Sequence, residues 1–120
     1  YFVNWFRKND DGQFVWPGFG DNARVLKWIS QRLDGEAEAL DTPVGRVPTR
    51  GSLDLSGLSL SEADLSTLLD VDAAVWAEEA ALIPDFYGKF GDRLPQALWN
   101  QHAALTQRIK AGRAAAIAAE

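Results

Sequence analysis

The sequence has no cysteine and no methionine among its 120 residues, and it has one histidine, His102. The absence of cysteine excludes disulfide bonds, thiolate nucleophiles and zinc–thiolate sites from this segment. A single histidine excludes a metal site built from several histidines. We interpret His102 as a packed or surface side chain, since it has no histidine or cysteine partner for a metal.

Basic residues are also in the minority: 12 Lys and Arg stand against 17 Asp and Glu, a net charge of −5. This balance argues against a nucleic-acid partner, which would require a basic surface. No apolar run approaches the ~18 residues of a membrane span, and no signal peptide opens the chain, so we expect no membrane partner. With 47% hydrophobic and 24% charged residues, the chain is typical of one folded domain.

Aromatic residues are concentrated at the start, where seven of them fall within the first 19 positions. Residues 1–6 have the aromatic and β-branched character of a strand, yet no partner strand precedes them. Residues 7–13 contain Asn, Asp and Gly, which favour a hairpin turn, and residues 14–16 would return as its second strand. The missing methionine and this opening strand predict a segment cut from a larger protein, with a short N-terminal β-hairpin belonging to a larger sheet.

The rest of the sequence predicts a mostly α-helical segment. Apolar spacing predicts a helix over residues 23–33, preceded by Asp21 or Asn22 as its cap. Residues 36–59 are predicted to be mostly irregular, with a short extended piece at 44–47.

Three further helices are expected after residue 59. The first follows a capping box near Ser61 and runs to about residue 69. The second starts at Asp70 or Asp72 and should kink or split at Pro84, because proline removes a backbone donor. The third opens after Pro95, and Gly112 is expected to end it, leaving an alanine-rich tail.

The aromatic and glycine-rich start offers the most specific chemistry. The rings of Phe6, Phe14 and Phe19 would be brought together by a hairpin, and facing rings make a slot for a flat ligand. Gly18 and Gly20 would allow close approach to the backbone, while Asn22 carries an amide suited to a polar ring edge. Aromatic side chains on hairpins more often simply pack, and Trp16 and Trp28 are expected to pack in either case. The residues alone leave both interpretations open.

With Asn-Trp-Phe-Arg-Lys at residues 4–8 and Trp-Pro-Gly-Phe-Gly-Asp-Asn at residues 16–22, this segment closely resembles the C-terminal portion of GTP-dependent phosphoenolpyruvate carboxykinase. The run 16–22, Trp-Pro-Gly-Phe-Gly-Asp-Asn, is the most specific part of the resemblance. The similarity weakens through the helical residues 60–112. The matching positions are residues 4–8, 11–12, 14, 16–22, 24–26, 28, 42–48 and 53–58.

The resemblance implies a guanine pocket in this segment. Phe6 and Phe19 would sandwich the base, Phe14 would line the same slot, and Asn22 would bond the guanine edge near O6. Gly20 and Asp21 complete the nucleotide-contacting run. Because an amide can satisfy either purine edge by flipping, Asn22 would discriminate only if its neighbours hold it in one orientation.

The resemblance further implies an α/β parent enzyme, a monomeric cytoplasmic carboxy-lyase of gluconeogenesis. It would convert oxaloacetate and GTP to phosphoenolpyruvate, CO2 and GDP, with Mn2+ (and Mg2+) bound by residues upstream of this segment. No Gly-Lys-Ser/Thr phosphate loop occurs in the 120 residues. We therefore expect no catalytic or metal-binding residue here, and no activity from the segment alone.

Residues 1–120 would then be the C-terminal part of a nucleotide-binding domain. Within it we expect a hairpin and guanine-binding loop (1–22), a helix and irregular segment (23–59), a helical segment (60–112) and a tail (113–120). The alternative from another class is a non-catalytic helical interaction module, whose hairpin aromatics only pack or bind a protein partner.

Overall fold

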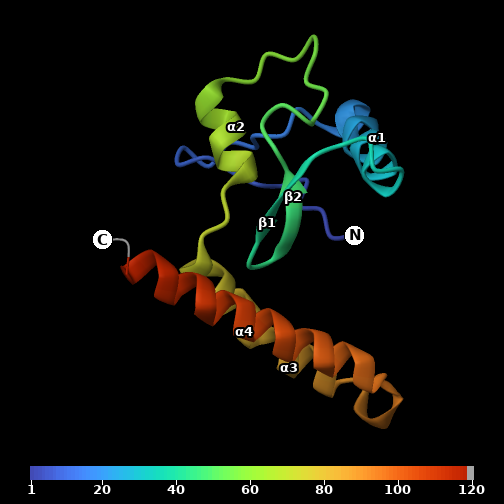
Figure 1. Ribbon diagram of the computed structural model, residues 1–120, viewed down its shortest axis with the longest axis vertical. Coiled ribbons are helices and arrows are strands. Elements are labelled where there is room, and N and C mark those ends of the chain that lie inside the picture. The colour runs from blue at the N-terminus through green and yellow to red at the C-terminus, as the bar shows by residue number, and fades with distance from the viewer. Residues whose placement is uncertain (119–120) are drawn as a thin grey trace. The chain divides into compact units, whose positions relative to one another are not determined.

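A computed structural model describes residues 1–118 of the chain, the backbone alone being described for 115–118. The described residues form α-helices, one pair of strands and short 3-10 turns. In chain order the elements are η1 (Phe19–Asp21), α1 (Asn22–Leu33), β1 (Ala39–Thr42), β2 (Gly45–Pro48), α2 (Glu62–Leu69), α3 (Ala73–Gly88), η2 (Gly91–Arg93) and α4 (Gln96–Ala118) (Figure 1). The mostly helical prediction is confirmed.

The chain divides into two compact units. The first contains residues 1–41 and 46–70, and the second contains residues 42–45 and the chain from Val71 onward. No helix in the described part of the chain is long and apolar enough to cross a membrane.

The first unit is built around two buried indoles. Trp16 and Trp28 are 6% and 5% exposed, and they pack with Leu53 into one apolar cluster. Trp5, Val25 and other partly buried side chains surround this cluster. The packing role predicted for Trp16 and Trp28 is confirmed. Because one indole precedes η1 and the other lies within α1, this core fixes the segment between them.

The predicted N-terminal hairpin is present only as a turn with one antiparallel bridge, between Lys8 and Phe14. Gly12, at φ 76°, and the Asn9 side chain, which accepts from the Gln13 N–H at 2.9 Å, shape the turn. Residues 1–7 form no strand, because a strand needs a neighbouring ladder and this short bridge supplies none.

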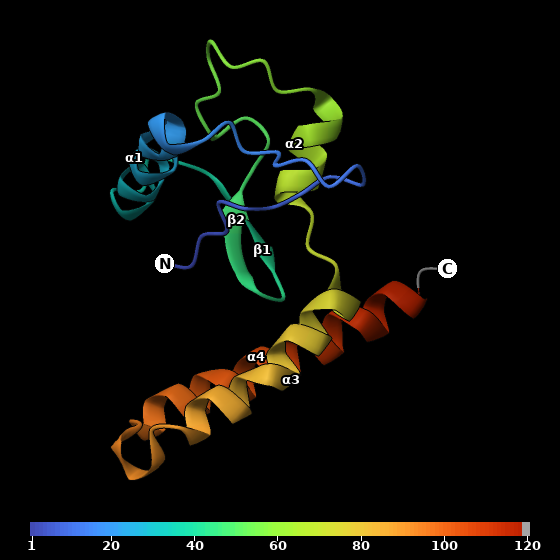
Figure 2. The same ribbon diagram turned by 180° about the vertical axis from the view of Figure 1, so that it is seen from behind.

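The two-stranded hairpin lies instead at β1 and β2, within the segment predicted to be irregular apart from one extended piece. Gly45, at φ 124°, adopts a conformation that side chains rarely allow, and the Thr42 hydroxyl donates to its carbonyl oxygen at 2.6 Å. Pro43 obscures this turn in the sequence, because proline is as typical of a break between irregular pieces as of a tight turn. Figure 2 shows the hairpin from behind.

The helix starts follow the predicted capping chemistry. Ser61 caps α2 in a reciprocal capping box with Asp64, and the Asp72 carboxylate caps α3 by accepting from the Ala74 and Val75 N–H groups. Asp21 precedes α1 without a side-chain cap bond. The capping prediction is thus confirmed for α2 and α3.

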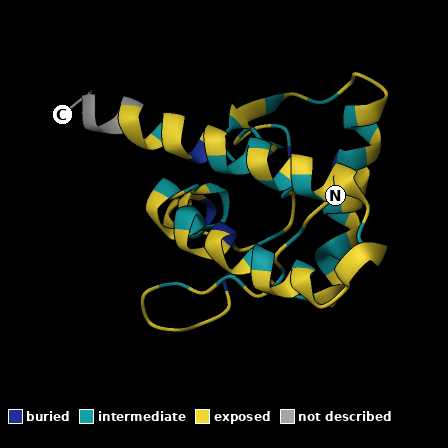
Figure 3. Cartoon of the chain, turned by 90° about the horizontal axis from the view of Figure 1, so that it is seen from below, coloured by how far each residue is buried: buried dark blue, intermediate teal, exposed yellow. Residues whose placement is uncertain are grey.

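In the second unit, α3 and α4 lie side by side and run in opposite directions (Figures 1 and 2). Among its described side chains, those of Ala80 and Ile109 are buried, and the Tyr87 and Trp99 rings meet edge-on with centroids 5.2 Å apart. Exposed positions predominate along both helices (Figure 3).

The prediction that Gly112 ends the last helix is wrong, since α4 continues to Ala118. Glycine costs only about 1 kcal/mol inside a helix, and the alanines that follow are the strongest helix formers. The part of the predicted tail at residues 119–120 lies outside the described residues.

Pro84 does not split α3, which runs unbroken from Ala73 to Gly88. Because proline has no N–H, the carbonyl of Ala80, four residues earlier, loses its helical partner. His102 on α4 replaces that partner: its Nε2 lies 2.9 Å from the Ala80 oxygen. A carbonyl only accepts, so His102 Nε2 is the donor.

We therefore expect His102→Leu to destabilise the protein by about 1–3 kcal/mol, the cost of an unpaired buried carbonyl. The same substitution in a Pro84→Ala background should cost clearly less, because alanine restores the helical N–H donor. Urea unfolding of the four variants measures this coupling. Equal costs in the two backgrounds would show that His102 acts by packing alone.

Candidate functional site

The aromatic side chains at the start of the chain separate into buried and exposed sets. Trp16 is buried and Trp5 half-buried, with ring centroids 6.1 Å apart. The three phenyl rings of the predicted site, by contrast, face solvent: Phe6 is 71% exposed, Phe14 60% and Phe19 92%. Several large apolar side chains left exposed within one short segment are typical of a binding surface.

Phe6 and Phe14 are brought together by the turn at 9–12. Their ring centroids lie 6.0 Å apart at an interplanar angle of 65°, so the rings meet edge-on. The Lys8 ammonium lies 5.1 Å from the Phe14 centroid. An edge-on pair holds no parallel slot between its own rings, so any sandwich of a flat ligand requires the ring of Phe19 as well.

Phe19, Gly20 and Asp21 form η1, the single turn that leads into α1. Gly18 precedes it at φ 126°, a conformation that favours glycine, and its carbonyl accepts from the Asp21 N–H at 3.1 Å. Space around Gly18 and Gly20 is open, with no atom within 4 Å of an added Cβ. The backbone here is therefore accessible to a ligand.

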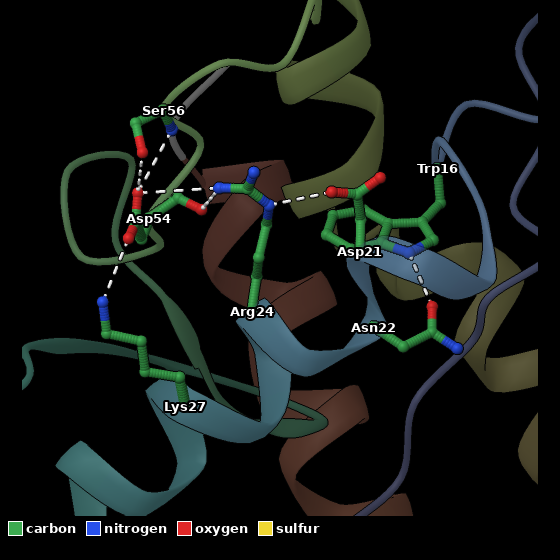
Figure 4. Close-up of polar contacts among 7 residues, drawn as sticks. All are labelled: Trp16, Asp21, Asn22, Arg24, Lys27, Asp54 and Ser56. Carbon is green, nitrogen blue, oxygen red and sulfur yellow. Dashed lines mark hydrogen bonds and ion pairs between the residues drawn. The ribbon is translucent and has the colours of Figure 1, made fainter.

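Asn22, the first residue of α1, is held by the core. The Trp16 Nε1–H donates to Asn22 Oδ1 at 2.8 Å in a partly buried position (Figure 4). The sequence indicated packing for Trp16 and base contact for Asn22, but not a bond between them. Their separation of six residues across a glycine-rich turn gives no periodic signal.

Asp21 is tied to α1 and to the loop after the hairpin through Arg24. Arg24 Nε donates to Asp21 Oδ1 at 2.9 Å, and its Nη1 donates to the Asp54 carbonyl at 3.0 Å (Figure 4). Sequence reasoning missed this role of Arg24. The three-residue spacing of Asp21 and Arg24 at a helix start was the signal that could have found it.

Asp54 is the centre of a small polar network at that loop. Its carboxylate accepts from the Ser56 hydroxyl and N–H at 2.6 and 3.1 Å, and from Lys27 Nζ at 3.0 Å. The Ser56 hydroxyl bond first, and then the Lys27 ammonium, lower the pKa of Asp54 far below its usual range. Asp54 thus stays ionised, and the network links α1 to the loop at 54–56.

A metal site is not formed by the described residues: no three His, Cys, Asp or Glu side chains among residues 1–118 gather to hold an ion. His102 is engaged with the Ala80 carbonyl instead.

Comparison with known proteins decides the family. Residues 1–108 match the model of the phosphoenolpyruvate carboxykinase C-terminal P-loop domain. The chain belongs to this family. The match covers the exposed phenyl rings, the η1 turn and the network around Asp54.

Curated relatives are named phosphoenolpyruvate carboxykinase [GTP]. That of Renibacterium salmoninarum is 50% identical over 109 residues, 91% of this chain and 18% of its own length. Those of Neocallimastix frontalis and Chlamydia caviae are 50% and 44% identical, each over 92% of this chain and 18% of their own length. The chain therefore spans about a fifth of the length of these relatives.

The lowered pKa of Asp54 predicts that the stability of the protein depends on pH. Because folding lowers its pKa, its contribution to stability is full above the unfolded pKa of about 4 and is lost as pH falls toward the folded pKa. Asp54→Asn should lower the unfolding temperature by a margin that is constant from neutral pH to about pH 4 and shrinks below it.

Thermal unfolding of both proteins across this pH range measures the margin. Asp41→Asn is the matched control, since its pairing with Arg46 lies on an exposed hairpin, with side chains 86% and 63% exposed. A margin for Asp54→Asn no larger than that of the control would contradict the role given to the network.

Proposed function

We propose that this chain is the guanine-recognising C-terminal segment of a GTP-dependent phosphoenolpyruvate carboxykinase. The complete enzyme would convert oxaloacetate and GTP to phosphoenolpyruvate, CO2 and GDP, and the segment alone would be inactive. The observation that carries the proposal is the exposure of Phe6, Phe14 and Phe19, the last of them on an anchored η1 turn, in a chain of this family.

In this proposal, residues 1–22 recognise the base. Phe6 and Phe19 stack on its two faces, and Phe14 lines the slot beside Phe6. Stacking on an aromatic ring contributes roughly 1–3 kcal/mol per base. Gly20 allows close approach, and Asp21, held by Arg24, keeps the turn in place while Asn22 meets the base edge.

Residues 23–59 support this site, because they supply α1 and the Asp54 network that fix the turn. Residues 60–112 are a helical segment of the same chain. Among the described residues, no three His, Cys, Asp or Glu side chains gather where they could hold Mn2+ or Mg2+. The metal, the phosphate loop and the substrate-binding groups belong, in this proposal, to other parts of the α/β enzyme, a monomer of the cytoplasm.

Phe19→Ala should weaken GTP binding to the complete enzyme at least tenfold, because it removes one face of the slot. Folding should survive, since the ring is 92% exposed and leaves no cavity. Titration calorimetry with GTP measures the change. Phe86→Ala, which removes a half-exposed phenyl ring from α3, is the control; unchanged GTP affinity in Phe19→Ala would contradict the stacking assignment.

Tryptophan fluorescence separates this proposal from a non-catalytic interaction module. Trp16 lies next to Asn22 and Trp5 next to Trp16, so base binding should change their emission. We expect GDP, but not ADP at the same concentration, to quench the emission of the complete enzyme. An interaction module would respond to neither nucleotide, and the family match does not favour that alternative.

A further inference from the structure

The contact between Trp16 and Asn22 fixes the orientation of an amide. An indole N–H only donates, so the atom of Asn22 that lies 2.8 Å from Trp16 Nε1 is its oxygen. Figure 4 shows the amide nitrogen of Asn22 on the side away from the indole. In the part of the chain that the structure describes, no side chain takes a hydrogen bond from this nitrogen.

The core holds this orientation. Trp16 is 6% exposed, and its ring is packed against Trp28 and Leu53 in the apolar cluster. If the amide flipped, two N–H groups would meet the indole N–H, and a nearly buried donor would lose its acceptor. An unpaired buried donor is costly, so the flipped state is disfavoured.

The outward side of Asn22 therefore presents the amide N–H donors, while its oxygen is turned toward the indole. A purine with a carbonyl at C6, as in guanine, offers an acceptor to such a face. A purine with an amino group at C6, as in adenine, places a donor at that position, where the amide N–H would face another N–H.

From this geometry we infer that Trp16 is a positioning residue for base selection: its indole N–H holds Asn22 so that the site accepts 6-oxopurine nucleotides and rejects 6-aminopurine nucleotides. This inference rests on the proposed function, in which Asn22 meets the base edge. A freely rotating amide could bond either purine. The contact with Trp16 explains how the Asn22 amide discriminates between the two.

The test compares GDP and ADP dissociation constants of the complete enzyme, measured by titration calorimetry, for wild type and Trp16→Phe. The substitution keeps an aromatic ring in the core and removes the N–H donor together with the second ring of the indole. We expect the preference for GDP over ADP to fall by roughly five- to tenfold, because the amide becomes free to flip. Trp28→Phe is the matched control: it removes the N–H of an equally buried indole, which donates to the Ser52 hydroxyl and the Glu38 carbonyl, and should leave the preference unchanged.

A double-mutant cycle separates positioning from general loosening of the core. In an Asn22→Ala background, Trp16→Phe should change the GDP/ADP preference by less than about twofold, because Trp16 acts through the amide. A preference that stays at the wild-type value in Trp16→Phe, or that falls equally with and without Asn22, overturns the inference. A wild-type enzyme that does not prefer GDP overturns the proposed function instead, so the two failures are distinct.

A second variant covers the case in which Trp16→Phe does not fold. Asn22→Asp keeps an oxygen for the indole N–H and turns the outward face into an acceptor. GDP binding should weaken at least about tenfold while ADP binding does not weaken. Equal weakening of both nucleotides would overturn the inference.

Discussion

A buried indole must find an acceptor for its N–H, and this requirement organises the first unit. Trp28 donates to the Glu38 carbonyl and the Ser52 hydroxyl, and so ties α1 to the segments on either side of the β1–β2 hairpin. Trp16 donates to Asn22, and so ties the aromatic opening of the chain to the start of α1. The apolar cluster gains stability by removing side chains from water, and these donor–acceptor pairs favour one arrangement of the segments around it.

In the second unit, the buried group that needs a partner is an acceptor rather than a donor. Pro84 creates an orphaned acceptor inside α3, and His102 supplies a donor from α4. In both units, a buried polar group has no hydrogen-bond partner in the nearby backbone. A side chain from another part of the unit supplies that partner. Such pairs favour one arrangement of helices over others that would bury the same apolar area.

Local signals predicted much of the fold and little of the site geometry. The helix starts at Ser61 and Asp72 follow from capping chemistry, which acts within four residues. Three features were not predicted: the β1–β2 hairpin, the unbroken α3 and the continuation of α4 through Gly112. The first two depend on partners elsewhere in the chain, and the third depends on the helix propensity of the neighbouring alanines. Single residues carry neither kind of information. The family's aromatic and glycine-rich run identified the candidate site residues, whereas the bonds from Trp16 to Asn22 and from Arg24 to Asp54 join positions that no periodicity links.

In the proposed site, the exposed phenyl rings and the Asn22 amide would do different work: the rings would provide affinity for a base, and the amide would provide selectivity between bases. Every base has a π-face, so stacking on Phe6 and Phe19 would contribute roughly 1–3 kcal/mol whichever purine enters. Three solvent-exposed rings therefore cannot select guanine. Selection requires a polar side chain that faces the base edge in one fixed orientation. Neither a flip of that side chain nor an entering water molecule may then restore the hydrogen bonds that the wrong base loses. A freely rotating Asn would fail this condition, whereas a side chain held from the core meets it. Under the proposed function, the buried side of the site would therefore carry the specificity and the exposed side would carry the binding.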